Sequence, residues 1–287
     1  MAAGTATRAV LITGCSSGIG RMTAWRLFRG GWPVYATARR VDDLAELAAM
    51  GMPTLALDVT DERSITAAVN RVVDEHGAVG VLINNAGYAL SGTVEETAPE
   101  DIRAQFETNV VGPAELMRAV LPGMRARRDG LIVNVSSIVG RFGVPGGGFY
   151  QASKHAVEAL SDALRLEVAP FGIRVTVVEP GPVATPFATT AVHTLRGDLP
   201  EYADFRARLV DWYDAVYRRT RRTVAGTFRS DPDAVARVIE HALRSRRPRA
   251  RYPVGPLARG ILLLRRMLPD PAFDAFVRWQ FPVPQPE

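Results

Sequence analysis

Tyr150 and Lys154 are the two residues whose types and spacing suggest chemistry most directly. The chain has 35 lysines and arginines, and only one of them, Lys154, is a lysine. If this segment is helical, both side chains lie on one face, one turn apart. An ammonium is a compact charge that favours the ionised form of a neighbouring phenol. The pair is therefore predicted to give and take a proton, the alternative being a surface pair without function.

A glycine-rich turn near the N-terminus predicts a phosphate site. A short apolar strand at 10–12 precedes it, and a helix over 21–28 follows it. In this context Gly14 permits a tight turn, Gly18 lets the backbone approach a pyrophosphate, and Gly20 allows close helix packing. The start of the helix offers unpaired N–H groups to the anion. The turn therefore indicates a dinucleotide cofactor.

The end of the second expected strand, Val34–Ala38, bears on the choice of cofactor. In dinucleotide-binding folds an acidic residue at this point binds the ribose 2′-hydroxyl, whereas an arginine accommodates a 2′-phosphate. This chain has Ala38 where the acid would stand, followed by Arg39. The sequence therefore favours NADP over NAD, unless Arg39 only covers the surface.

Strands and helices alternate along the first two thirds of the chain. Alternation at this spacing is typical of right-handed β-α-β units, so we predict an α/β fold with a doubly wound, Rossmann-type parallel sheet. Such sheets bind ligands at the carboxyl ends of their strands. Further strands are expected at 54–57, 79–83, 130–135 and 174–178, and helices at 44–50, 65–75, 110–127 and 150–168.

The part from residue 185 onward shows no further chemical motif. With no repeat or linker in the sequence, residues 1–287 are predicted to form a single domain, in which residues 185–287 supply a substrate loop, a C-terminal helical substrate cap and a tail. The tail is expected to cover the substrate cleft or a neighbouring subunit rather than a membrane. The expected elements are a loop at Phe187–Pro200, helices at 201–222 and 231–244, a strand at 252–255, and an apolar, arginine-rich tail at 257–267 and 273–281.

Composition narrows the possible partners. The formal net charge is +5, but the arginines are spread out, and the densest run, 218–222, lacks the interleaved aromatics of a nucleic-acid site. One cysteine, Cys15, and four scattered histidines predict neither an internal disulfide nor a metal site. The N-terminus does not resemble a signal peptide and no apolar run reaches the length of a membrane span, so a soluble, cytoplasmic protein is expected.

Together these motifs resemble the short-chain dehydrogenase/reductase family over about residues 10–187. The residues that carry the resemblance are Thr13-Gly14, Gly18-Ile19-Gly20, Asn84-Asn85-Ala86-Gly87, Asn109, Ser137, Tyr150, Lys154 and Pro180-Gly181. The segment Val34–Thr37 and the long arm after Thr185 are similar, more narrowly, to the 17β-hydroxysteroid and retinol dehydrogenase branch. By the family pattern, the second serine of the 136–137 pair is the catalytic one.

The resemblance implies NADP(H)-dependent interconversion of an alcohol and a carbonyl. Tyr150 would donate the proton, Ser137 would hydrogen-bond the carbonyl oxygen, and Lys154 would stabilise the tyrosinate and hold the nicotinamide ribose. Asn109 would anchor a water that leads protons to Lys154, although it could also be a simple helix cap. The predicted catalytic residues are Asn109, Ser137, Tyr150 and Lys154. The predicted cofactor-binding residues are Gly14, Ser16, Ser17, Gly18, Ile19, Gly20, Arg39, Asp58, Val59, Asn85, Ala86, Gly87, Tyr150, Lys154, Pro180, Gly181, Val183 and Thr185.

The substrate is expected to be apolar and steroid- or retinoid-like, and the protein to be a homodimer or homotetramer. Three glycines at 146–148 predict a flexible segment beside the substrate. Two alternatives stay open: a reductase of small or fatty carbonyls, and a non-catalytic NADP-binding sensor. The complete set of Ser137, Tyr150 and Lys154 argues against the sensor, because a pure binder needs no proton donor.

Overall fold

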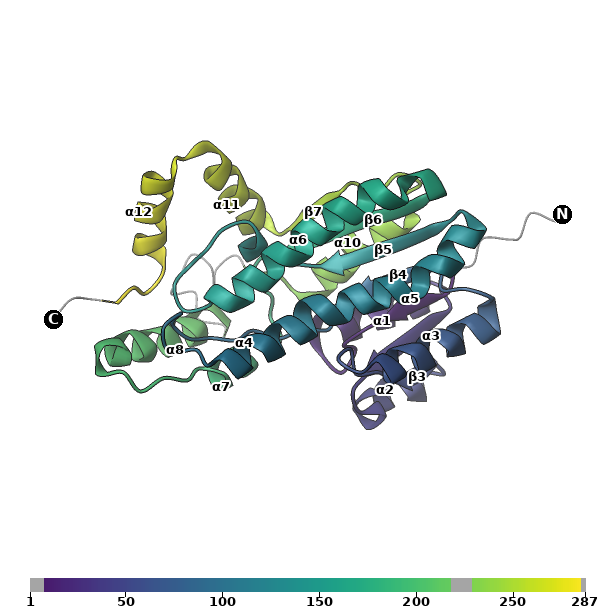
Figure 1. Cartoon of the computed structure of the whole chain (residues 1–287), viewed down its shortest axis with the longest axis horizontal. Coiled ribbons are helices and arrows are strands. Elements are labelled where there is room, and N and C mark those ends of the chain that lie inside the picture. The colour runs from purple at the N-terminus through teal and green to yellow at the C-terminus, as the bar shows by residue number, and fades with distance from the viewer. Residues whose placement is uncertain (1–7, 218–228, 285–287) are drawn as a thin grey trace.

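The computed structural model describes residues 8–217 and 229–284 of the 287-residue chain. Within these ranges one parallel sheet has the strand order β3-β2-β1-β4-β5-β6-β7 (Figure 1). All of its ladders are parallel, which confirms the predicted Rossmann-type fold. The strands are β1 Val10–Ile12, β2 Val34–Ala38, β3 Thr54–Ala56, β4 Val81–Asn84, β5 Gly130–Val135, β6 Ile173–Pro180 and β7 Arg251–Val254.

Helices cover both faces of the sheet. The described helices are α1 Gly18–Arg29, α2 Ala45–Ala49, α3 Glu62–His76, α4 Pro99–Phe106, α5 Gly112–Arg127, α6 Gly148–Val168, α7 Phe187–His193, α8 Ala203–Tyr217, α10 Pro232–Arg244, α11 Pro256–Met267 and α12 Asp270–Gln280. Successive residues of β1 point to opposite faces of the sheet and belong to two separate hydrophobic cores. Val10 and Ile12 pack in one core with α1 and α10, and Leu11 packs in the other with α3 and α5. Covered on both faces, the central strands are buried along their whole length.

The helix around Asn109 begins earlier than the sequence predicted. Helix α4 starts at Pro99 and runs through a π-helical turn, Glu107–Val111, into α5. The predicted start at Val110 was therefore wrong. Pro113 has no backbone N–H to donate within the helix, and the preceding π-helical turn accommodates it without ending the helix.

Two expectations for the later chain also change. Phe187–Pro200, predicted as a loop, contains the helix α7. Thr194, the residue that follows α7, is held by two hydrogen bonds: its Oγ1 atom donates to Ala89 O at 2.9 Å and accepts from Ser91 N at 3.1 Å. These contacts join distant parts of the chain, so the periodicity of the sequence does not reveal them. The helix expected at 201–222 is described as α8 up to Tyr217, and the arginine run 218–222 lies outside the described residues.

The tail forms two helices, α11 and α12, which lie with α8 beyond the carboxyl ends of the strands (Figure 1). Ile261, Phe273 and Val277 of these helices pack with Ile138 and Phe142, from the segment that follows β5, in a separate apolar cluster. The tail thus buries its apolar side against the loop that follows the predicted catalytic serine. In the described ranges, none of the helices has the length and apolar character needed to cross a membrane.

Candidate active site

A cavity of about 740 Å³ opens at the carboxyl ends of the strands and gathers nearly all of the predicted site residues. Of the predicted set, all but Gly20 and Asn109 line it. Gly20 lies beneath the glycine turn, where a Cβ atom would be 2.5 Å from Asn85 Nδ2 and would also meet Gly14 O. Segments from residue 14 to residue 281 therefore meet around one space.

The glycine turn has the shape that a pyrophosphate needs. Gly14 and Gly18 have φ values of 71° and 55°, which only glycine adopts without strain. A Cβ atom on Gly18 would lie 2.9 Å from Thr185 Cγ2, so a side chain there would fill the space between the turn and the residues after β6. Asn85 Nδ2 holds the turn by donating to Thr13 O at 2.9 Å and Gly14 O at 3.1 Å. With the start of α1 facing the cavity, these residues fit a dinucleotide.

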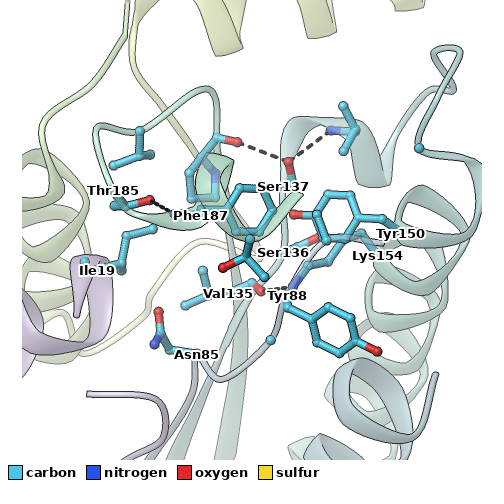
Figure 2. A pocket seen from close by; sticks show the side chains of 18 of the residues that line it. Ile19, Asn85, Tyr88, Val135, Ser136, Ser137, Tyr150, Lys154, Thr185 and Phe187 are labelled. Carbon is cyan, nitrogen blue, oxygen red and sulfur yellow. Dashed lines mark hydrogen bonds between the residues drawn. The ribbon is translucent and has the colours of Figure 1, made fainter. Parts of the chain in front are cut away.

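Tyr150 and Lys154 lie one turn apart on α6, and both line the cavity (Figure 2). The Lys154 Nζ atom donates to Val135 O at 2.9 Å and is 5.8 Å from the centre of the Tyr150 ring. Burial lowers the pKa of Lys154 to about 8, and Glu158, one turn further along α6, raises it. The ammonium is therefore close to the phenol and is fixed in place by a backbone carbonyl.

The protonation state of Tyr150 differs from the sequence expectation. The ammonium was expected to favour the ionised phenol, but the pKa of Tyr150 is raised. Loss of solvent around the phenol is the largest cause, while the hydrogen bond with Ser137 acts in the opposite direction and Tyr213 raises the pKa further. The phenol therefore keeps its proton, as an ordinary tyrosine does near neutral pH, and burial makes it a weaker acid rather than a stronger one.

Ser137 faces the same space from the end of β5 (Figure 2). Its side chain caps the short 3₁₀ turn Ile138–Gly140: Ser137 Oγ accepts from Val139 N at 3.3 Å and donates to Pro180 O at 3.5 Å. The hydroxyl is therefore tied both to its own turn and to the end of β6.

Asn109 is buried in the π-helical turn and is not a helix cap. Its Nδ2 atom donates to Tyr88 O at 3.0 Å and Ser153 Oγ at 3.1 Å, and its Oδ1 atom accepts from Tyr88 N at 3.2 Å. A Cβ atom on Gly87 would lie 2.9 Å from Asn109 Oδ1 and 3.8 Å from Lys154 Nζ. Asn109 thus joins the strand-end loop to α6 beside the lysine, and its role in carrying protons stays a prediction.

Arg39 lies exposed at the rim of the cavity, directly after β2. Its neighbour Arg40 is paired with Asp43 at 2.6 Å, and Arg21 is paired with Glu46 at 2.9 Å. Among the described residues, Arg39 has neither a hydrogen bond nor an ion pair. Its guanidinium is therefore available to an anionic group in the cavity.

An aromatic wall formed by α8 and the tail was not predicted from the sequence. Trp212, Tyr213 and Tyr217 line the cavity from α8, and Phe281 lines it from the end of α12. Trp212 packs against Phe281 with 4.9 Å between ring centres and a tilt of 36° between the rings, and its Nε1 donates to Gln280 O at 3.2 Å. The spacing of the three α8 aromatics was a visible signal, but only the fold shows that they line the same cavity as Tyr150.

Comparisons with known proteins agree with this geometry. Residues 8–196 match the family model described as "short chain dehydrogenase". The chain is 36% identical over 293 residues to human retinol dehydrogenase 5, covering 96% of this chain and 89% of that protein. It is 43% identical over 196 residues to 3-ketodihydrosphingosine reductase of Bacteroides thetaiotaomicron, covering 68% and 71%. A solved serine dehydrogenase complexed with NADP+ is 28% identical, with a TM-score of 0.74 over 87% of this chain and 95% of that one.

Proposed function

The chain belongs to the short-chain dehydrogenase/reductase family, and from this premise we propose that it is an NADP(H)-dependent oxidoreductase that interconverts an alcohol and a carbonyl group on an apolar substrate. The observation that carries the proposal is the meeting of Ser137, Tyr150 and Lys154 in the cavity that also holds the glycine turn and Arg39. A binder without turnover would not need the first three.

The residues divide the work of the reaction. The glycine turn would hold the pyrophosphate of a dinucleotide and Arg39 its 2′-phosphate, and a bound nicotinamide would supply or accept the hydride. In the direction of reduction, neutral Tyr150 donates its proton to the carbonyl oxygen. Ser137 hydrogen-bonds the same oxygen as negative charge develops on it, and Lys154 stabilises the resulting tyrosinate.

The choice of NADP rests on Arg39, and Arg39→Ala tests it. We expect the Kd for NADPH to rise about tenfold or more, with a much smaller change for NADH, because only NADPH carries the 2′-phosphate that a charged hydrogen bond would reach. Arg40→Ala is the matched control, since Arg40 is already paired with Asp43. Equal losses for the two cofactors, measured by nucleotide fluorescence titration, would show that Arg39 does not bind the phosphate.

The substrate side of the cavity supports an apolar substrate. Phe187, 5.5 Å from the Tyr150 ring between centres, and the aromatic wall of α8 and the tail surround the place where a carbonyl would approach Tyr150. The relatives named for retinol and for 3-ketodihydrosphingosine point to substrates that are mainly hydrocarbon. The second name favours a fatty ketone as the second candidate substrate. NADPH oxidation against a panel of steroid, retinoid, fatty and small carbonyls tests both.

The tail is proposed to form part of the substrate wall, and Phe281→Ala tests this role. Removing the ring should raise KM for bulky apolar carbonyls about ten- to a hundredfold, because an aromatic contact with the substrate worth about 1.5–3 kcal/mol is lost, while small carbonyls change little. Trp279→Ala is the control, because Trp279 lies two residues before Phe281, at the end of α12, but is 74% exposed. A uniform rise in KM for all carbonyls would contradict this role.

The homo-oligomer and the cytoplasmic location stay predictions.

A further inference from the structure

Two buried carboxylates, Glu158 and Glu179, lie near the turn that follows Ser137 and take no part in the proposed reaction. Glu179 stands near the end of β6, directly before Pro180, and Glu158 lies one helical turn after Lys154 on α6. Glu179 is 1% exposed and Glu158 is 5% exposed. Two like charges this deep are costly unless cations are close to them.

Two arginines from other elements reach these carboxylates. Arg251, at the start of β7, donates from Nε to Glu158 Oε2 at 2.9 Å, and the same Nε is 3.7 Å from Glu179 Oε1. Arg141 Nη1 is 3.4 Å from Glu179 Oε1 and 4.0 Å from Glu158 Oε2. We call these four side chains the carboxylate cluster. It joins β6, α6 and β7 to the residue that ends the 3₁₀ turn after the catalytic serine.

The turn lies directly on the cluster. A Cβ atom on Gly140 would be 2.8 Å from Ser136 Oγ and 3.2 Å from Glu158 Cγ, so no larger residue fits there without a shift. Glu158 Oε1 and Ser136 Oγ are buried and have no hydrogen-bond partner among the described residues. One oxygen of the cluster, Glu158 Oε1, is therefore unsatisfied, and partly satisfied buried polar groups are costly.

The hydroxyl of Ser137 depends on both sides of this cluster. It donates to Pro180 O, in the residue after Glu179, and accepts from Val139 N, in the turn that ends at Arg141. The ion pair between Arg141 and Glu179 therefore connects the two segments that hold the serine.

We propose that Glu179, acting through Arg141, is a positioning residue that sets the orientation of Ser137 and makes it depend on pH. Ionised Glu179 holds Arg141, and with it the turn, against β6. Protonated Glu179 loses this ion pair and leaves Arg141 only the longer, 4.0 Å approach to Glu158, so the turn is held less firmly. The inference rests on the proposed function, because it assigns Ser137 its role in the reaction.

The direction of the pH dependence follows from the charges around Glu179. Burial raises the pKa of Glu179 to about 7, Glu158 raises it further, and Arg141 and Arg251 lower it. Asp162 faces the group only through Arg251, at 2.5 Å. Because this pKa lies above the ordinary value of 4.5, the proton stabilises the fold below pH 4.5, and this contribution is lost as the pH rises through about 7. Over the same interval the ionised form that holds Arg141 becomes populated, so kcat should rise with pH.

The pH profile of kcat tests the proposal, with NADPH and 9,10-phenanthrenequinone as the carbonyl probe. The wild type should show a rising limb with its midpoint near pH 7. Glu179→Gln should remove this limb and lower kcat about tenfold at about pH 8, and Arg141→Ala should do the same. Arg141→Lys should retain most of the limb, and the Kd for NADPH should change less than about twofold in all three.

Asp162→Asn is the matched control, because Asp162 binds Arg251 but not Arg141. This variant should keep the limb. Persistence of the limb in Glu179→Gln, or its loss in Asp162→Asn, would overturn the proposal.

A second measurement separates this inference from the proposed function. If the wild type reduces no carbonyl, the proposed function fails, and a denaturant double-mutant cycle of Arg141→Ala and Glu179→Gln at about pH 8 then decides the inference. Non-additive free energies of unfolding would support the link between turn and strand. Additive values would overturn it.

Discussion

Replacing Tyr150 by phenylalanine should lower kcat by about 10²–10⁴-fold, the usual contribution of a positioned acid–base group. The variant keeps the ring that contacts Phe187 and removes only the hydroxyl, so folding and NADPH binding should be preserved. Steady-state NADPH oxidation with the best carbonyl of the panel gives kcat, and fluorescence titration gives the Kd for NADPH.

Tyr213→Phe is the matched control for this prediction. Tyr213 lines the same cavity, but its hydroxyl is hydrogen-bonded to Ser91 Oγ at 3.1 Å. Removing that hydroxyl should change kcat only a few-fold, because Tyr213 does not stand one turn from the ammonium. If Tyr150→Phe retained activity within a few-fold of the wild type, Tyr150 would not be the proton donor.

Lys154→Arg should lower kcat by about 10²-fold or more, although it keeps a positive charge. Lys154 is 7% exposed. Its Nζ atom donates to Val135 O, and a Cβ atom added to Gly87 would lie only 3.8 Å from it, so there is little room for a larger group. A planar guanidinium is larger and cannot place a point charge at the same spot. It also would not lose its proton near pH 8, as the lysine does.

His155→Arg provides the control for Lys154→Arg, since it adds an arginine to the exposed side of the same helix. It should leave kcat within about twofold of the wild type, as expected of a surface substitution. Normal turnover by Lys154→Arg would mean that the single lysine reflects only the arginine-rich composition. An unchanged circular dichroism spectrum and an unchanged Kd for NADPH would show that Lys154→Arg is folded and that its loss of activity comes from the misplaced charge.

The properties that could be predicted from the sequence are those that depend on residues close together in the chain. The alternation of apolar strands with helices predicted the parallel sheet, because each β-α-β unit is specified by nearby residues. Gly14 and Gly18 were predictable for the same reason, since their positive φ values belong to the turn itself. The close approach of Thr185 to Gly18 is a tertiary contact. The positions of Tyr150 and Lys154 followed from helical spacing alone.

The start of the helix that contains Asn109 and the presence of the helix that begins at Phe187 could not be predicted from the sequence. The π-helical turn lets a helix continue past Pro113, which local rules treat as a helix start. Helix α7 ends at His193 and is followed by Thr194, whose partners Ala89 and Ser91 are about a hundred residues away in the chain. Long-range hydrogen bonds leave no periodic signal.

The sequence by itself determined the parallel sheet and the spacing of the glycine turn and of the Tyr150–Lys154 pair, because these rest on short-range order. The roles of these residues in cofactor binding and proton transfer stay predictions. Only the tertiary structure decided that the pKa of Tyr150 is raised, since desolvation depends on what covers the phenol. It also decided that Trp212 of α8 meets Phe281 of the tail, and that Glu179 meets Arg141. Each of these pairs joins residues from separate elements, and the free energy of such contacts depends on distance and burial, which residue order along the chain does not specify.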